Sequence, residues 1–184
     1  MKIVFLLEER SMKVVLDKLL PEILPADYQF VTIPHEGKND LRKSIPIKLK
    51  AWNEPDVKFV ILHDQDAADC IQLKNDLLKV CETTGRDCLV RIVCHELESW
   101  YWGDINAIEQ AYGVNLDKLK SKRKFINPDD MVDPKKELKK YIPDHQQISG
   151  AKKISQYMHV MSNRSKSFQV FVSGVRGICN TDKG

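Results

Sequence analysis

The sequence lacks long apolar stretches, and it lacks closely paired cysteines. Its longest apolar runs, such as residues 57–62, have the length of a strand, whereas a helix that spans a membrane needs about 20 apolar residues. Residues 1–7 run directly into two glutamates, without the longer apolar stretch and cleavage site of a signal peptide. The five cysteines form no C-x-x-C pair, which favours reduced thiols. We therefore expect a soluble protein of the cytoplasm that does not bind membranes.

The net charge of +3 hides an uneven distribution of charged side chains. Residues 1–114 contain 14 Lys and Arg against 19 Asp and Glu, whereas residues 115–184 contain 15 against 7. An acidic part followed by a basic part is typical of a metal site followed by a surface that binds a polyanion. A Lys-rich, solubilising helical tail explains the basic part equally well. We expect an α/β domain in residues 1–114, with residues 115–184 as a basic, mostly helical extension packed on it.

Short runs of β-forming residues alternate with helical patterns in the first 113 residues. Strands are expected at residues 2–7, 28–33, 57–62 and 88–94, with two further helices at residues 67–83 and 100–112 besides those described below. Such alternation with short connections indicates right-handed βαβ units and a mainly parallel, four-stranded sheet flanked by helices. In the basic part, one helix is expected at residues 151–161 and a strand-like run at residues 168–175.

Caps and prolines define the expected limits of the first two helices. Ser11 is expected to cap the first helix, which ends near Pro21 or Pro25. Asp40 is expected to cap the second helix, in which Pro46 is tolerated only near the start or at a break.

Acidic side chains follow three of the four expected strands. They are Glu8 and Glu9 after the first strand, Asp64 and Asp66 after the third, and Glu96 and Glu98 after the fourth. Ligands of parallel sheets bind beyond the carboxyl ends of the strands. Carboxylates crowded there repel one another unless a cation compensates, and hard oxygen ligands suit Mg²⁺ or Mn²⁺. Asp64 and Asp66 point to one side if the segment stays extended, although Asp66 has the alternative role of a helix cap.

Four segments carry a resemblance to a known family, namely residues 7–11, 35–38, 63–67 and 94–100. A glutamate closing the first strand and an Asp-x-Asp closing the third resemble a Toprim domain. That catalytic domain is shared by topoisomerases, primases and the overcoming-lysogenization-defect (OLD) nucleases. The four segments in this order are similar to a bacterial Toprim-related family of unknown function, whose members are found beside ATPase genes in mobile or phage-defence islands. The resemblance covers roughly residues 1–112.

The resemblance implies roles for the acidic residues. Glu8 would match the Toprim glutamate, and Asp64 and Asp66 would be the ligands of Mg²⁺ or Mn²⁺. Because Glu9 replaces the usual glycine, either Glu8 or Glu9 faces the metal. Glu96 and Glu98 would correspond to additional acids that Toprim nucleases place after the fourth strand.

The function implied is that of a metal-dependent phosphodiesterase that cuts DNA or RNA, in a bacterial defence or mobile-element system with a partner ATPase. The alternative is a non-catalytic Toprim-like subunit that binds nucleic acid or regulates the ATPase. The choice between DNA and RNA, the cleavage specificity and the oligomeric state stay open.

Basic side chains are candidates for binding the phosphate backbone. Lys38 beside Gly37 is placed to neutralise a phosphate, although an exposed turn lysine is the more ordinary reading. Basic and aromatic residues interleave in segments 118–125 and 135–141, which is typical of backbone contacts without sequence reading. The candidates are Lys120, Lys122, Arg123 and Lys124. Residues 100–102 (Trp-Tyr-Trp) are expected to pack in the core, with stacking on a base as the alternative.

Other site motifs fail because they lack an obligatory residue. Residues 95–99 begin like a zincin motif but have Ser99 in place of the second histidine. Gly37 and Lys38 lack the upstream glycine and the Ser or Thr of a P-loop. A receiver domain needs a Thr or Ser after the fourth strand, where this chain has His95. His63 and His95 end neighbouring strands, and polar residues at a sheet edge are a commoner reading for them than proton transfer.

Overall fold

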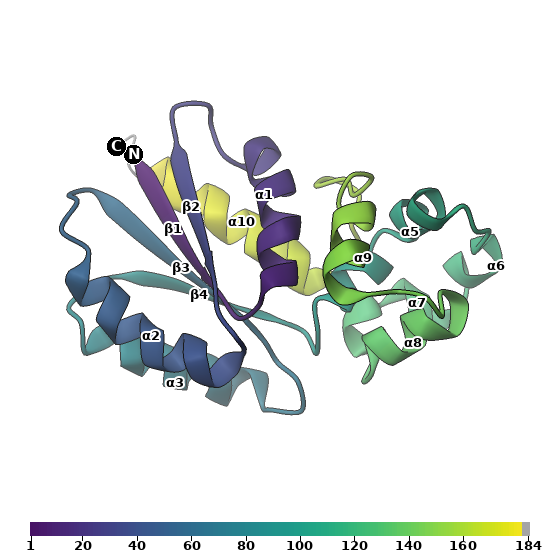
Figure 1. Cartoon of the computed structure of the whole chain (residues 1–184), viewed down its shortest axis with the longest axis horizontal. Coiled ribbons are helices and arrows are strands. Elements are labelled where there is room, and N and C mark those ends of the chain that lie inside the picture. The colour runs from purple at the N-terminus through teal and green to yellow at the C-terminus, as the bar shows by residue number, and fades with distance from the viewer. Residues whose placement is uncertain (182–184) are drawn as a thin grey trace.

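The computed structural model describes residues 1–181, which form a four-stranded parallel sheet flanked by helices (Figure 1). The strands are β1 (Lys2–Leu7), β2 (Gln29–Pro34), β3 (Val57–Asp64) and β4 (Cys88–Val93). They lie in the order β2-β1-β3-β4, and every neighbouring pair is parallel. The four strands and the α/β fold expected from the sequence are confirmed.

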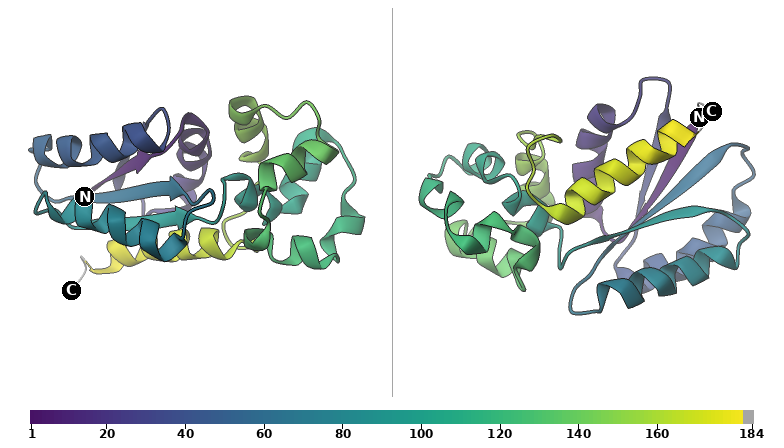
Figure 2. Two further views of the ribbon diagram at one scale, coloured as in Figure 1. Left: turned by 90° about the horizontal axis from the view of Figure 1, so that it is seen from below. Right: turned by 180° about the vertical axis from the view of Figure 1, so that it is seen from behind.

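Alternate residues of β1 face two different layers of helices. Ile3, Phe5 and Leu7 face the layer of α1 (Arg10–Ile23) and α10 (Lys166–Thr181), whereas Val4 and Leu6 face the layer of α2 (Lys38–Ala51) and α3 (Cys70–Glu82). Figure 2 shows α10 lying across the strands. Because both faces of β1 are covered, the strand is an almost continuous apolar run, as is usual for a buried parallel strand.

Short helices gather beside the carboxyl end of the sheet, where Figure 1 shows α9 next to α1. They are α4 (Glu98–Trp102), α5 (Ile105–Tyr112), α6 (Asp117–Lys120), α7 (Arg123–Ile126), η1 (Pro128–Asp130), α8 (Pro134–Tyr141) and α9 (Gln147–Ile154). We call α5 to α9 the helical part. Among residues 1–181, no helix is long and apolar enough to cross a membrane.

The three aromatic residues of α4 join the sheet to the helical part. Trp100, Tyr101 and Trp102 are at most 1% exposed, so the expectation of core packing is confirmed and base stacking is excluded. The Trp100 ring lies 5.0 Å from that of Phe168 on α10. The Trp102 ring lies 4.9 Å from that of Phe125 on α7. The hydrophobic core therefore runs from the sheet into the helical part, and the division at residue 114 stays a prediction.

The strand expected at residues 168–175 is wrong, because this segment belongs to α10. Phe168, Phe171, Val172 and Val175 are all buried. Their spacing of three and four residues places them on one face of a helix. The valines favour a strand by propensity, but contact of this helical face with the sheet and with Trp100 outweighs that preference.

The expected caps of the first three helices are also wrong. Glu9, not Ser11, is the cap residue of α1, and the Ser11 hydroxyl donates to the Glu9 carboxylate. Gly37 precedes α2, and Asp40 lies inside its first turn, where it accepts from the amide of Glu36. Asp69 caps α3 by accepting from the Gln72 amide. Asp66 is therefore not a helix cap.

Three further helix limits differ from the expectation. α1 continues through Pro21 to Ile23, and α2 continues through Pro46 to Ala51. The helix expected at residues 100–112 is interrupted at Gly103, beside which the side chain of Asn163 packs so closely that a Cβ would overlap it. The helix expected at residues 151–161 spans Gln147–Ile154.

Candidate metal centre

Parallel pairing brings acidic side chains from three strand ends to one edge of the sheet. Leu7 lies opposite Leu62, and Asp64 lies opposite Val93, so the residues that follow β1, β3 and β4 emerge together. The backbone amide of Asp64 donates to Glu8 Oε2 at 2.9 Å. Glu8, Asp64 and Glu98 are each at most 9% exposed, which is unusual for carboxyl groups.

Asp64 has the most extreme environment of this acidic cluster. Its side chain is buried, and Oδ1 has no hydrogen-bond partner. Burial raises its pKa well above the ordinary value, and the charges of Glu8, Glu9, Glu98 and Asp66 raise the pKa further. In the absence of a cation, the Asp64 carboxyl group therefore takes up a proton more readily than an exposed aspartate.

Glu8 and Glu9 lie on different sides of this edge. Glu8 Oε2 lies 2.9 Å from Nδ1 of the buried His63. Burial lowers the pKa of His63, but the hydrogen bond to Glu8 and its charge outweigh this and raise the pKa above its ordinary value. Glu9 turns toward the helical part, where Gln147 of α9 donates to its carboxylate. Burial raises the pKa of Glu9 as well.

Asp66 is held away from Asp64 by the shape of its loop. β3 ends at Asp64, and Asp66 has a φ of 51°, so the segment is no longer extended. The expectation that Asp64 and Asp66 point to one side is therefore wrong. Asp66 Oδ2 instead accepts from Lys38 Nζ at 2.9 Å. His95, with a φ of 58°, accepts on its carbonyl from the Asp66 amide. Two neighbouring non-glycine residues in this region indicate stored strain, which is typical of functional loops.

Two shallow hollows flank the Asp66 loop. One, of about 230 Å³, is lined by Lys38 and Arg42 as well as His63 and Asp66. The other, of about 330 Å³, is lined by Asp66, His95 and Glu96, together with residues before α8. A basic hollow and an acidic one therefore lie on either side of the loop.

Glu96 and Glu98 have different surroundings although they are two residues apart. Glu96 Oε2 accepts from the amide of Lys135 in α8 and is partly exposed. Burial raises the pKa of Glu98 to about 7, although the charge of Lys135 lowers it. Glu98 Oε1 lies 3.9 Å from Nε2 of His145.

The helical part contributes residues to this edge that the sequence did not predict. Lys135, His145 and Gln147 act on Glu98 or Glu9 from α8 and from the segment before α9. His145 has no cysteine or histidine partner at metal-ligand spacing, so no local pattern in the sequence identifies it. Lys135 belongs to a segment expected to contact phosphate.

The chemistry of these side chains fits a divalent cation, although their present conformation is closed. Among residues 1–181, no three His, Cys, Asp or Glu side chains are arranged to hold a metal ion. Glu8, Glu9 and Asp66 each accept from a protein donor, whereas Asp64 Oδ1 is a buried acceptor without one. Carboxylate oxygens are the ligands that Mg²⁺ prefers. Glu8, Asp64 and Asp66 would therefore hold a cation only after Asp66 has left Lys38.

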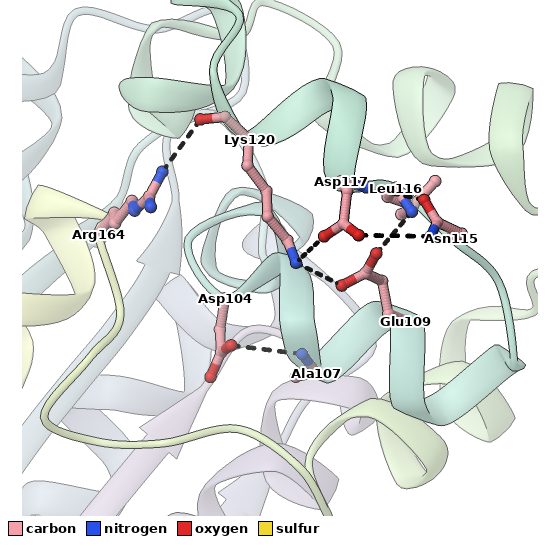
Figure 3. A network of polar contacts seen from close by, with 8 residues as sticks. All are labelled: Asp104, Ala107, Glu109, Asn115, Leu116, Asp117, Lys120 and Arg164. Carbon is pink, nitrogen blue, oxygen red and sulfur yellow. Dashed lines mark hydrogen bonds and ion pairs between the residues drawn. The ribbon is translucent and has the colours of Figure 1, made fainter.

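Two of the basic candidates are already engaged by acidic side chains. Figure 3 shows the Lys120 ammonium between Glu109 and Asp117, at 2.7 Å and 2.6 Å. Lys124 lies 2.6 Å from Glu137. Lys122 and Arg123 are exposed. Phosphate binding by these four side chains stays a prediction.

The sequence matches a family model over residues 7–176, described as a domain of unknown function, DUF4276. The chain belongs to the DUF4276 family. The DUF4276 fold resembles that of the C-terminal region of the OLD protein of Xanthomonas campestris pv. campestris, with a TM-score of 0.53. The match covers 99% of this chain and 98% of that one, at 13% sequence identity. A search of curated proteins gave no match. The Toprim-like fold expected from the sequence is thus confirmed at the level of the fold.

Proposed function

We propose that this DUF4276 chain is a Toprim-type phosphodiesterase that depends on Mg²⁺ or Mn²⁺ and cuts DNA or RNA. The observation that carries the proposal is the buried Asp64 carboxyl group, whose Oδ1 lacks a partner among Glu8, Glu9 and Glu98. Burying a charged group without compensation is costly. A cation bound there would relieve the repulsion of the acids, and a site for a phosphodiester would follow.

The proposed roles of the side chains follow from their positions. Glu8, Asp64 and Asp66 are the proposed metal ligands, and His63 orients Glu8 through the contact at 2.9 Å. Once bound, the cation supplies charge stabilisation for a phosphate that is being cleaved. Lys38 would neutralise a phosphate oxygen in the basic hollow, and in doing so it would release Asp66. Glu96 and Glu98 are the additional acids of the centre.

The basic surface is the proposed contact with the nucleic-acid backbone. Lys122 and Arg123 are exposed and ready for phosphate contacts, whereas Lys120 and Lys124 would have to exchange carboxylates for phosphates. We propose that the protein acts in the cytoplasm with a partner ATPase, in a bacterial defence or mobile-element system. The fold likeness to the C-terminal region of an OLD protein supports this context.

A second candidate is a non-catalytic subunit that binds nucleic acid or regulates an ATPase. The observation that favours it is the closed conformation, in which Lys38 takes the carboxylate of Asp66 and no three ligands converge among residues 1–181.

The two candidates differ in the effect of Asp64→Asn on cleavage. In the presence of Mg²⁺ or Mn²⁺ and any ATPase encoded beside the gene, we expect this variant to cut nucleic acid at least about 10²-fold more slowly. Asp27→Asn, at an exposed position distant from the cluster, is the matched control and should cut normally. The nuclease proposal is refuted if the unaltered chain cuts neither DNA nor RNA under these conditions while still binding them.

A further inference from the structure

Three buried polar atoms among residues 1–181 have no hydrogen-bond partner, and they surround one carboxylate. They are Asp64 Oδ1, Tyr101 Oη and His145 Nε2. His145 Nε2 lies 3.9 Å from Glu98 Oε1, and the rings of Tyr101 and His145 are 6.3 Å apart. The charge of Glu98 acts on both Asp64 and Tyr101. Buried polar atoms are nearly always paired in proteins, so three unpaired atoms around Glu98 indicate a missing partner.

The charge around Glu98 favours a cation as that partner. Glu9 and Asp64 add negative potential to the interior that Tyr101 shares with Glu98. The nearby positive charge is that of Lys135, with Lys139 acting on His145. Burial and these two lysines lower the pKa of His145 to about 4, so its imidazole is neutral. A neutral imidazole has a lone pair to give to a metal ion.

The His145 ring is held as the ring of a metal-binding histidine usually is. Its Nδ1 lies 2.7 Å from the Tyr112 hydroxyl oxygen, and donation from Nδ1 to that oxygen leaves the lone pair on Nε2. Histidine ligands of metals commonly have such a partner on the other ring nitrogen. Gly150 fixes the ring from the opposite side, because a Cβ at this position would lie 2.2 Å from His145 Cε1. The ring therefore cannot turn Nε2 away from Glu98.

The separation of the two candidate ligands agrees with a shared cation. Two ligands at about 2.1 Å from one ion are about 3 Å apart when adjacent and about 4.2 Å apart when opposite. The distance of 3.9 Å between His145 Nε2 and Glu98 Oε1 lies within this range. An ion between them needs no movement of either side chain, with the Tyr101 hydroxyl and water as further ligands.

We propose that Glu98 and His145 bind a divalent cation, and that the imidazole nitrogen makes this site prefer Mn²⁺ to Mg²⁺. Imidazole is a better ligand for transition metals than for Mg²⁺, which prefers oxygen. The site adds a second cation to the proposed nuclease centre, next to the one assigned to Glu8, Asp64 and Asp66. It rests on the proposed function only for that use, since binding is tested without cleavage.

The test is electron spin echo spectroscopy of Mn²⁺ added to the full chain. We expect modulation from a directly coordinated ¹⁴N nucleus, which is replaced by that of ¹⁵N when the protein carries ¹⁵N-labelled histidine. The nitrogen signal should disappear in His145→Gln and persist in His159→Gln, an exposed histidine that serves as the matched control. Glu98→Gln should weaken Mn²⁺ binding at this site by at least about 10-fold.

Each outcome decides between the proposals. The site is overturned if Mn²⁺ binds the unaltered chain without nitrogen coupling, or does not bind at millimolar concentration, since Lys135 then compensates Glu98 alone. It is also overturned if His159→Gln, and not His145→Gln, removes the signal. If His145→Gln does not fold, the labelled unaltered chain still gives the answer. Nitrogen-coupled Mn²⁺ in a chain that cuts no nucleic acid would support this site and refute the nuclease.

Discussion

Replacement of Glu98 by glutamine should change the pH dependence of stability in the metal-free protein. Burial raises the pKa of Glu98 from an ordinary 4.5 to about 7. Between these two values the folded state holds a proton that the unfolded state has lost, so the free energy of unfolding falls as the pH rises. The difference of about 2.5 in pKa corresponds to about 3 kcal/mol. Glu98 is only 4% exposed, so solvent screening reduces this figure little.

The glutamine of Glu98→Gln has nearly the same shape and no charge to desolvate. Below pH 4.5 the variant and the unaltered chain should therefore have similar stability. Between pH 4.5 and pH 7 the variant should gain up to about 3 kcal/mol relative to the unaltered chain, at about 1.4 kcal/mol for each pH unit. Above pH 7 the difference should stay constant, because both states of the unaltered chain are then ionised at this position.

Urea denaturation in the presence of EDTA, at intervals from pH 4 to pH 8.5, measures this difference. Glu22→Gln removes an exposed glutamate of α1 and serves as the matched control, with a difference that should stay within a few tenths of a kcal/mol. Mn²⁺ should reverse the order, because a ligand at 100 times its Kd stabilises only the binding form, by about 2.7 kcal/mol. A difference that does not change with pH would refute the assignment of a buried, proton-binding Glu98.

Further predictions concern the basic surface, the His145 pocket and the Asp66 loop. The salt dependence of nucleic-acid binding should flatten by about 0.9 for each lost phosphate contact on duplex DNA when alanine replaces Lys120, Lys122, Arg123 and Lys124. An unchanged slope would mean that this surface is only solvated. Gly150→Ala should cost about 1–3 kcal/mol in urea denaturation because its Cβ meets His145 at 2.2 Å, whereas Gly177→Ala, with open space, should not destabilise the protein. Lys38→Met should strengthen Mg²⁺ binding in calorimetry because it frees Asp66; an unchanged Kd would argue against Asp66 as a ligand.

The sheet and its acidic edge could be predicted because their causes are local. Apolar runs of strand length at 2–7 and 57–62 form β1 and β3, and parallel pairing then brings Glu8 and Asp64 together. α10 could not be distinguished from a strand by propensity alone, since its valines favour either structure and only contact with Trp100 and the sheet decides.

The contribution of the helical part could not be predicted because it depends on distant contacts. His145 reaches Glu98 across 47 positions of sequence only when α5 and α9 pack together. Gln147 reaches Glu9 across 138 positions. The orientation of Asp66 likewise depends on a positive φ and on a lysine of another helix. None of these contacts has a periodic or spaced pattern in the sequence.

The position of α10 also constrains how the chain folds during synthesis. One face of β1, with Ile3, Phe5 and Leu7, is covered jointly by α1 and α10, yet residues 94–165 separate β4 from α10. At roughly 5–20 residues per second, ribosomes add that stretch in several seconds. During this time a strand surface rich in apolar side chains has only α1 as cover. Chaperone binding to nascent chains should therefore be strongest before residue 166 is made, and it should fall once α10 has emerged.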